Sequence, residues 1–466
     1  MTQIIDKAIA YAKQNDATYF NDFIELLKIA SISTDSTHHA EIISAANWLK
    51  RYLEKIGVTK SRVIETTQNP LVIGEWLGAG PDKPTILVYG HYDVQPPDPI
   101  DQWISDPFVP TVRDNHLFSR GASDMKGQLM IALSAIQAYA ATSELPVNLK
   151  FIFEGEEEIG SPTIENYLKE NKDLLKADFA LNLDAGMISM DYPTIVYGLR
   201  GLAYFEIKIK GPSHDLHSGL FGGIVYNPAQ ALCEILSKMK SSNGKIMLPN
   251  FYNSVIDIND EEREALKRLP LGEEYYLDQS GTTILTGETG YSAVERVGAR
   301  PTLEIHGILT GYTGEGPKTV IPAEAVAKIS MRLVPNQTPE EVHGQLLEFM
   351  QKNAPGSVTW EIKKLASDPA CVIERDFWAT TCFASALEKV WNKAPVYKRE
   401  GGSIPIVSHM RTILGMPSVL SGFGLPDDRI HSPNENMHLE MWQRGIETVI
   451  WFLGTVADYR AKRLNP

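Results

Sequence analysis

A run of apolar residues at 147–153 ends directly in the acidic segment EGEEEIGS, which covers residues 154–161. The run is typical of a buried strand. Carboxylates crowded at a strand end repel one another, so they need a compensating positive charge, and a metal ion can supply it. Matching ligand types stand in four other segments: GHYD at 90–93, SDMKG at 123–127, LNLD at 181–184 and IHSPNE at 430–435. Two histidines with three or more carboxylates are the ligand set of a two-metal hydrolytic site.

The composition excludes several classes of protein. With 466 residues, 43% of them hydrophobic, the chain is long enough for a soluble globular protein of two or three domains. The net charge of −14 and the lack of a Lys/Arg cluster argue against a nucleic-acid partner. The three cysteines are far apart and form no CxxC pair, so we expect a reducing compartment. The N-terminus is interrupted by charges and is neither a signal peptide nor a membrane span, so we expect a cytoplasmic protein without membrane contact.

Strand-like and helical patterns alternate over the first part of the chain. The segments that carry this pattern are strands at 71–76, 85–89, 147–153 and 177–184, and helices at 3–30, 39–56, 125–142 and 163–170. This alternation predicts an α/β sandwich with a mostly parallel central sheet. In open α/β sheets, ligands bind beyond the carboxyl ends of the strands, and His91, Glu158 and Asp184 all fall there.

The pattern changes after Gly198. Residues 202–210 and 325–333 alternate apolar and polar side chains, as half-exposed antiparallel strands do, and helical patterns cover 227–241 and 338–352. We therefore predict three segments: a catalytic domain at 1–198, an inserted α+β domain at 199–368, and the rest of the catalytic domain at 369–466, which ends in a long amphipathic helix.

Seven motifs occur in one order across nearly the whole chain: GHYDVQP, SDMKG, EGEEEIGS, DLHSGLFGG, MRLVPNQTP, REGGSIP and IHSPNE. In these motifs the chain resembles the co-catalytic metallopeptidases that include carnosine dipeptidases, cytosolic non-specific dipeptidases, acetylornithine deacetylase and succinyl-diaminopimelate desuccinylase. The resemblance implies an α/β/α sandwich of the phosphorylase/hydrolase type, with an inserted α+β domain that serves as lid and dimerisation domain.

The resemblance also implies a ligand set for two divalent metal ions. One ion would be held by His91, Asp124 and Asp184, and the other by Asp124, Glu158 and His431, so that Asp124 bridges the two. Zinc is the first expectation, and manganese or cobalt would also suit nitrogen and oxygen ligands. Such ions sit about 3.5–4 Å apart and share a water or hydroxide.

Further roles follow from the same resemblance. Glu157 is the expected general base, which takes the proton of the attacking water and later delivers it to the leaving amine. Asp93 is expected to hydrogen-bond the imidazole of His91 and orient it. Glu156 occupies a variable position of its motif and is given no role.

Four further residues are expected to contact the substrate, three of them (His217, Thr319 and Arg332) in the inserted domain. His217 resembles the histidine that reaches a neighbouring subunit's active site and steadies the oxyanion, which implies a homodimer. Arg332 resembles the arginine that binds the terminal carboxylate of the substrate, for which a planar fork of donors is well suited. Thr319 and Ser403 match further substrate contacts, whereas His214 is not part of the pattern.

One position separates the branches of the family. The residue at Asp184 is glutamate in the deacylases and carboxypeptidases, but aspartate in the dipeptidases and aminopeptidases. The sequence therefore predicts a metal-dependent dipeptidase that hydrolyses the amide bond of small peptides with a free C-terminal carboxylate. Two alternatives stay open: an N-acyl-amino-acid amidohydrolase of the same fold, and a catalytically silent binding or scaffold protein.

Overall fold

The structure is a computed structural model that describes residues 2–142 and 145–464. Contacts divide the chain into two compact units. The first comprises the residues up to Tyr197, Ile373–Tyr397 and the chain from Pro405 onward, and the second comprises Gly198–Val372 and Lys398–Ile404.

The sequence analysis placed residues 398–404 in the catalytic domain, but the contacts group Lys398–Ile404 with the second unit. It groups with the second unit because its backbone and side chains are hydrogen-bonded there. Arg200 Nε donates to the carbonyl of Gly401 at 2.8 Å, and Arg332 Nη1 donates to Ser403 Oγ at 3.0 Å. A composition change along the chain does not report such contacts.

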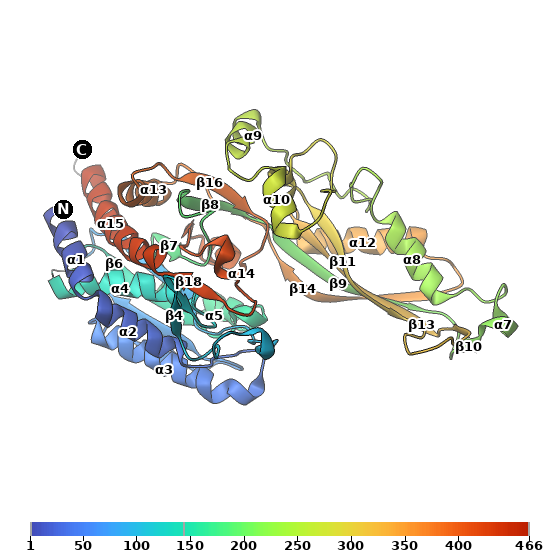
Figure 1. Cartoon of the computed structure of the whole chain (residues 1–466). Coiled ribbons are helices and arrows are strands. Elements are labelled where there is room, and N and C mark those ends of the chain that lie inside the picture. The colour runs from blue at the N-terminus through green and yellow to red at the C-terminus, as the bar shows by residue number, and fades with distance from the viewer. Residues whose placement is uncertain (1, 143–144, 465–466) are drawn as a thin grey trace. The chain divides into compact units, whose positions relative to one another are not determined.

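The largest sheet has nine strands in the order β1-β2-β6-β3-β7-β17-β8-β15, with β16 beside β8 (Figure 1). Their bounds are β1 Arg62–Ile64, β2 Leu71–Trp76, β3 Thr85–His91, β6 Asn148–Glu154, β7 Phe179–Asn182, β8 Thr194–Leu199, β15 Cys371–Val372, β16 Val396–Glu400 and β17 Ser418–Leu420. The central strands β6, β3, β7 and β17 run parallel, whereas β1, β2, β8 and β15 pair antiparallel with their neighbours. The predicted α/β class is confirmed, and the sheet is parallel at its centre and mixed overall. A short connection such as 65–70 allows only antiparallel pairing, since parallel neighbours need a longer crossover.

Helices cover both faces of this sheet, as alternating side chains on β6 demonstrate. Phe151 packs on one face, where a Cβ added to Gly74 would meet both this ring and Leu53 of a covering helix. Lys150 points to the other face and donates to the carbonyl of Leu174 at 2.6 Å. The helices are α1 Thr2–Gln14, α2 Asp16–Leu27, α3 His39–Lys55, α4 Lys126–Thr142, α5 Ile164–Glu170, α6 Lys172–Leu175, α13 Trp378–Trp391, α14 Pro405–Leu414 and α15 Leu439–Leu464.

Helix α4 lies at the centre of the core. It has no polar stripe and most of its residues are buried, which is typical of a helix packed on all sides. It contacts β3, and α1 and α15 pack side by side against it (Figure 1). Trp442 of α15 is buried and stacks on Phe23 of α2, with 5.8 Å between the ring centroids.

A small antiparallel sheet joins two distant parts of the chain. Its strands are β4 Thr111–Arg113, β5 His116–Phe118 and β18 Asn436–His438, and β18 pairs with β5. This pairing brings IHSPNE, which directly precedes β18, next to SDMKG, which follows β5. The sequence did not predict it, because strands of three residues carry no readable periodicity.

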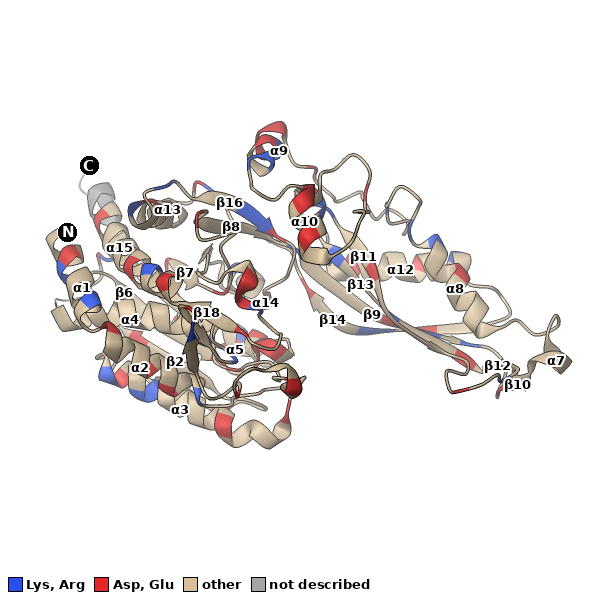
Figure 2. Ribbon diagram, in the orientation of Figure 1, with Lys and Arg blue, Asp and Glu red and all other residues tan. Residues whose placement is uncertain are grey.

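The second unit contains a four-stranded antiparallel sheet in the order β11-β13-β9-β14. Side chains on β9 alternate between buried and partly exposed, and the buried ones pack with α8 and α12. Basic and acidic residues are interspersed along the long strands (Figure 2), and some of them form ion pairs near the surface, such as Lys208–Glu324. The elements are β9 Gly201–Lys210, β10 Leu216–His217, α7 Ser218–Phe221, α8 Pro228–Lys238, α9 Asp260–Lys267, α10 Glu273–Ser280, α11 Ala293–Ala299, β11 Thr302–Thr310, β12 Val320–Ile321, β13 Glu324–Leu333, α12 Pro339–Asn353 and β14 Thr359–Asp368.

Within residues 2–142 and 145–464, no helix is both long enough and apolar enough to cross a membrane.

Candidate metal centre

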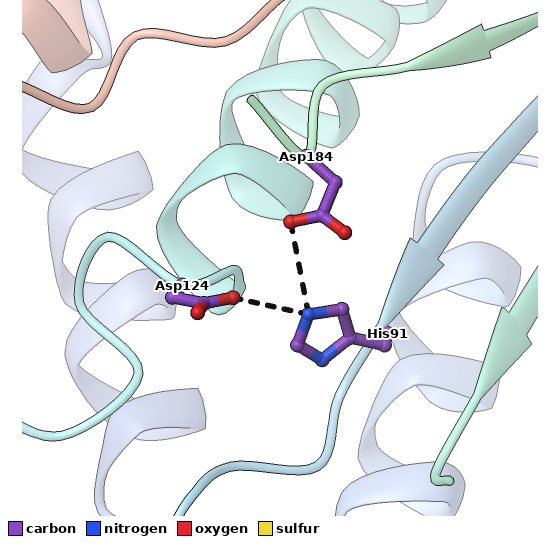
Figure 3. Close-up of side chains that lie close together, drawn as sticks. All are labelled: His91, Asp124 and Asp184. Atoms are coloured by element: carbon purple, nitrogen blue, oxygen red, sulfur yellow. Dashed lines mark hydrogen bonds and ion pairs between the residues drawn. The ribbon is translucent and has the colours of Figure 1, made fainter. Parts of the chain in front are cut away.

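The carboxyl ends of the parallel strands β3 and β7 meet at one edge of the central sheet. His91 is the last residue of β3 and is fully buried, and Asp184 follows the end of β7. Asp124 lies in the turn that precedes α4. Figure 3 shows these three side chains pointing toward one another from three separate segments.

The first group of side chains is His91, Asp124 and Asp184. His91 Nε2 lies 3.1 Å from Asp124 Oδ1 and 3.8 Å from Asp184 Oδ1 (Figure 3). One nitrogen and two carboxylate oxygens therefore converge on a single small region, within 4.8 Å of one another.

A second group is formed by Asp124, Glu158 and His431. His431 Nε2 lies 2.8 Å from Asp124 Oδ2 and 3.3 Å from Glu158 Oε2. Asp124 thus belongs to both groups and turns one oxygen toward each histidine. A carboxylate shared in this way is what a bridging ligand between two metal ions requires.

The electrostatics of the two groups fit a pair of cations. Burial raises the pKa of Asp184, and the neighbouring carboxylates of Asp124 and Glu158 raise it further. Hydrogen bonds to Asp124 and Glu158 raise the pKa of His431 to about 10. The raised pKa of His431 reflects the negative charge of the surrounding carboxylates, and divalent ions with nitrogen and oxygen ligands would supply a compensating positive charge at the same place.

Asp93 holds two parts of the site together. His91 Nδ1 lies 3.1 Å from the backbone carbonyl oxygen of Asp93 and 3.5 Å from its carboxylate. The same buried carboxylate accepts hydrogen bonds from the backbone N–H groups of Glu157 at 3.3 Å and Glu158 at 3.1 Å. The sequence predicted the partnership with His91, but not the second contact, which fixes the glutamate turn.

The three consecutive glutamates have different surroundings. Glu158 Oε2 accepts a hydrogen bond from Gln95 Nε2 at 2.8 Å, a contact that the sequence did not predict. Burial raises the pKa of Glu157 well above its usual value, while the charge of His91 opposes that shift, so the Glu157 carboxylate lies within the field of the site.

Glu156 faces away from this cluster and is also buried. Its carboxylate accepts the backbone N–H of Asn69 at 2.7 Å and the N–H and hydroxyl of Thr163 at 3.1 and 2.5 Å. These contacts hold the loops on either side of the glutamate turn, which gives Glu156 a structural part.

Glu435 is a buried carboxylate that the sequence analysis did not single out, although it ends the IHSPNE motif. It forms an ion pair with Arg120 at 2.7 Å, with both side chains buried. It also accepts the backbone N–H of Asp124 at 3.1 Å. The sequence shows Glu435 only as an acidic residue four positions after His431. Its hydrogen-bond partners could not be predicted, because they lie about three hundred residues earlier in the chain.

The four expected substrate contacts lie in the second unit as two pairs. Arg332 on β13 is half-buried, and its Nη1 donates to Ser403 Oγ at 3.0 Å. Burial lowers the pKa of Arg332. His217 ends β10 beside β12, and the N–H of Ser218 donates to the carbonyl of Thr319 at 3.1 Å.

The ring of His217 is exposed, and its Nδ1 accepts the backbone N–H of Gly219 at 2.9 Å. A neutral imidazole that accepts at Nδ1 carries its proton on Nε2. His217 therefore presents a hydrogen-bond donor to its surroundings.

Two histidines and three carboxylates with one carboxylate shared, at the carboxyl edge of an α/β sheet, are a residue set typical of metal-dependent hydrolases. The chain belongs to the peptidase family M20/M25/M40, whose model matches residues 87–453. The predictions of this family and of a metallopeptidase are therefore confirmed.

Relatives of known description lie close in sequence. The Cys-Gly metallodipeptidase of Schizosaccharomyces pombe is 32% identical over 98% of this chain and 99% of its own length. The human beta-Ala-His dipeptidase is 34% identical over 79% of this chain and 74% of its own. Among solved structures, the M20 family metallo-carboxypeptidase Sso-CP2 of Sulfolobus solfataricus superposes with a TM-score of 0.86 at 32% identity, covering 94% of this chain and 99% of its own.

Proposed function

We propose that the protein is a metal-dependent dipeptidase that hydrolyses the amide bond of short peptides with a free C-terminal carboxylate. The observation that carries this proposal is Asp124, whose two oxygens face His91 and His431 at 3.1 and 2.8 Å. The two relatives described as dipeptidases support the choice of substrate.

Five side chains would hold the two ions: His91, Asp124 and Asp184 the first, and Asp124, Glu158 and His431 the second. When bound, divalent ions such as zinc, manganese or cobalt supply Lewis acidity to a scissile carbonyl and lower the pKa of a shared water. The carboxylate of Asp93 contacts both the His91 ring and the backbone of the glutamate turn, and so fixes the position of one relative to the other. Gln95 Nε2 donates to Glu158 Oε2, the same oxygen that lies 3.3 Å from His431 Nε2, and so helps to orient this carboxylate toward the site.

Glu157 is our candidate for the general base. Its backbone is fixed through Asp93, and its carboxylate lies within the electrostatic field of His91 and Asp184. In this role Glu157 accepts a proton from the attacking water and later donates it to the leaving amine. Because Glu158 is held by Gln95 and His431, the two neighbouring glutamates are free to serve different purposes.

Arg332 is our candidate for recognition of the substrate's C-terminal carboxylate, with the hydroxyl of Ser403 beside it. A half-buried guanidinium has lost part of its hydration and gains from an anionic partner. His217 is proposed to donate from Nε2 to the oxyanion that forms during hydrolysis. Thr319 lies nearby, because its carbonyl accepts the backbone N–H of Ser218, the residue after His217.

We further propose that the second unit forms a homodimer. Strand β11 lies at the edge of its sheet, and its side chains Ile305, Ile308 and Leu309 are 44, 51 and 71% exposed. Aliphatic side chains on an open strand edge favour association with another chain. Leu220 and Ile224, at and just after α7, add a second exposed apolar group, with 73 and 78% exposure. Closure of the second unit over the substrate, as a lid, stays a prediction.

We also propose a cytoplasmic location, which the wide spacing of the three cysteines supports.

The assay that tests the dipeptidase proposal compares Cys-Gly and beta-Ala-His with N-acetyl amino acids, on metal-free protein reconstituted with zinc, manganese or cobalt. We expect hydrolysis of the dipeptides and little hydrolysis of the acylated amino acids. The reverse preference would favour the amidohydrolase alternative. Failure to bind two ions per chain would favour a silent binding protein.

A further inference from the structure

Glu435 has a hydrogen-bond pattern that separates it from other buried acids of the chain. Its side chain is buried, and its two oxygens accept four hydrogen bonds from one short segment. Oε2 accepts from Arg120 Nη1 at 2.7 Å and the N–H of Gly121 at 3.0 Å, and Oε1 accepts from the N–H groups of Ser123 and Asp124 at 3.1 Å each.

The segment held in this way is the turn that carries Asp124. Three backbone N–H groups of the turn converge on one carboxylate, so the turn cannot rotate without breaking several hydrogen bonds. Gly121 supports the turn with a φ of +82°, in the left-handed region that favours glycine. From this fixed backbone, Asp124 directs Oδ1 to His91 and Oδ2 to His431.

Glu435 also belongs to the chain segment that carries His431. Its backbone carbonyl accepts the N–H of Ser119 at 3.1 Å, and the next residue begins β18, which pairs with β5. Glu435 therefore connects the segment of one ligand with the turn that holds the shared ligand.

The chemistry of the contacts requires a carboxylate. An ionised carboxyl group accepts hydrogen bonds at both oxygens and donates none, which matches four donors. A glutamine at this position would place an NH₂ donor against N–H groups. A further negative charge beside the carboxylates of the site is unfavourable, and the buried ion pair with Arg120 offsets it.

We propose that Glu435 is a positioning residue that sets the bridging carboxylate of Asp124, so that both metal sites depend on it. This inference rests on the metal-dependent function proposed above. It predicts a specific pattern: loss of Glu435 weakens the two sites together, whereas loss of Asp184 weakens the site to which that side chain belongs.

The test measures metal affinity and does not depend on turnover. Metal-free wild-type, Glu435→Gln and Asp184→Asn proteins are titrated with Zn²⁺ against a competing chelator, and the affinities of the two sites are fitted. We expect both affinities of Glu435→Gln to fall about 10–100-fold, the usual effect of removing a group that orients a ligand. Cobalt absorption spectra of both sites should change with them.

A matched control removes a different buried Glu–Arg pair. Glu288 lies in the second unit and bonds Arg300 through both oxygens at 2.8 Å. Glu288→Gln removes a buried Glu–Arg ion pair, as Glu435→Gln does. It should leave both metal affinities within about twofold of the wild-type values, because, among the residues that the structure describes, Glu288 shares no contacts with the metal-site residues. A fall of the same size in this control would mean that loss of a buried ion pair is the cause, and would overturn the inference.

Circular dichroism and thermal unfolding of the metal-free proteins establish that the variants are folded. If Glu435→Gln does not fold, the metal affinities are measured on Glu435→Asp instead. Aspartate keeps the charge but is too short to reach all four donors, so we expect both metal sites to bind more weakly. A folded Glu435 variant that binds both ions as tightly as wild type, or that loses only one, would overturn the inference. Dipeptide hydrolysis by wild-type protein is measured separately. Two bound ions without hydrolysis would remove the dipeptidase proposal and leave this one standing.

Discussion

Amidating the C-terminus of a dipeptide substrate removes the charge that Arg332 is proposed to bind. The guanidinium is then left without its anionic partner while it stays half-buried beside Ser403. Breaking a desolvated charge pair from one side costs roughly 2–5 kcal/mol. Because Arg332 is only half-buried, water compensates part of the loss and the lower end of the range applies. About 2 kcal/mol corresponds to roughly a 30-fold lower kcat/KM for the amide.

The assay is a double-mutant cycle on kcat/KM, with acid and amide forms of one dipeptide on wild-type and Arg332→Ala proteins. The variant has no charge that distinguishes acid from amide, so we expect the 30-fold difference to shrink to about twofold or less. Lys328→Ala is a matched control, since Lys328 is an exposed cation four residues before Arg332 on the same strand β13. It should keep the full difference.

Two results would refute this reasoning. If wild-type protein cleaves the amide as fast as the acid, Arg332 does not read the terminal carboxylate and an aminopeptidase becomes the better description. If the difference persists in Arg332→Ala, another group recognises the carboxylate.

Three further predictions follow from other parts of the molecule. Glu157→Ala should keep two metal ions per chain by elemental analysis while turnover falls about 10²–10⁴-fold, whereas Glu158→Ala should lose metal; the opposite result would exchange their roles. Burial raises the pKa of Asp428 to about 7, so the folded state resists its ionisation while the unfolded chain ionises near pH 4. Asp428 should therefore lower the free energy of unfolding of the metal-free protein between about pH 4 and 7, by at most about 4 kcal/mol. Other buried carboxyl groups, such as Asp184, contribute to the same decline, so Asp428→Asn should make it smaller by the share of Asp428; the same decline in both proteins would contradict this. Leu309→Glu on the exposed edge strand should convert a dimer to a monomer in sedimentation experiments, and a monomeric wild-type protein would contradict the proposed interface.

The sequence predicted those site residues that directly follow a regular apolar strand. The strands that end in His91 and before Asp184 are apolar and regular, and the ends of parallel strands share one edge of a sheet. Glu435 could not be found in this way, because its hydrogen bond to Asp124 spans 311 positions in the chain. The contact of Asp93 with the glutamate turn was missed for a similar reason: backbone N–H donors do not depend on residue type.

Strand β17 was missed as well. It has three residues, which is too few to give a period, yet it lies between β7 and β8 in the centre of the sheet.

The position of β17 has a consequence for the order of events during synthesis. β7 leaves the ribosome with β3 and β6 already made, but the strand that covers its other edge follows only after about 240 further residues, at roughly 5–20 residues per second. A hydrogen-bonding edge at the middle of the future sheet is therefore open for roughly 10–50 s. His431 and Glu435 are made later still, so the proposed set of metal ligands is complete only in a nearly finished chain. An open strand edge can pair with another chain, so we expect the nascent protein to be most prone to association in the interval before β17 is made.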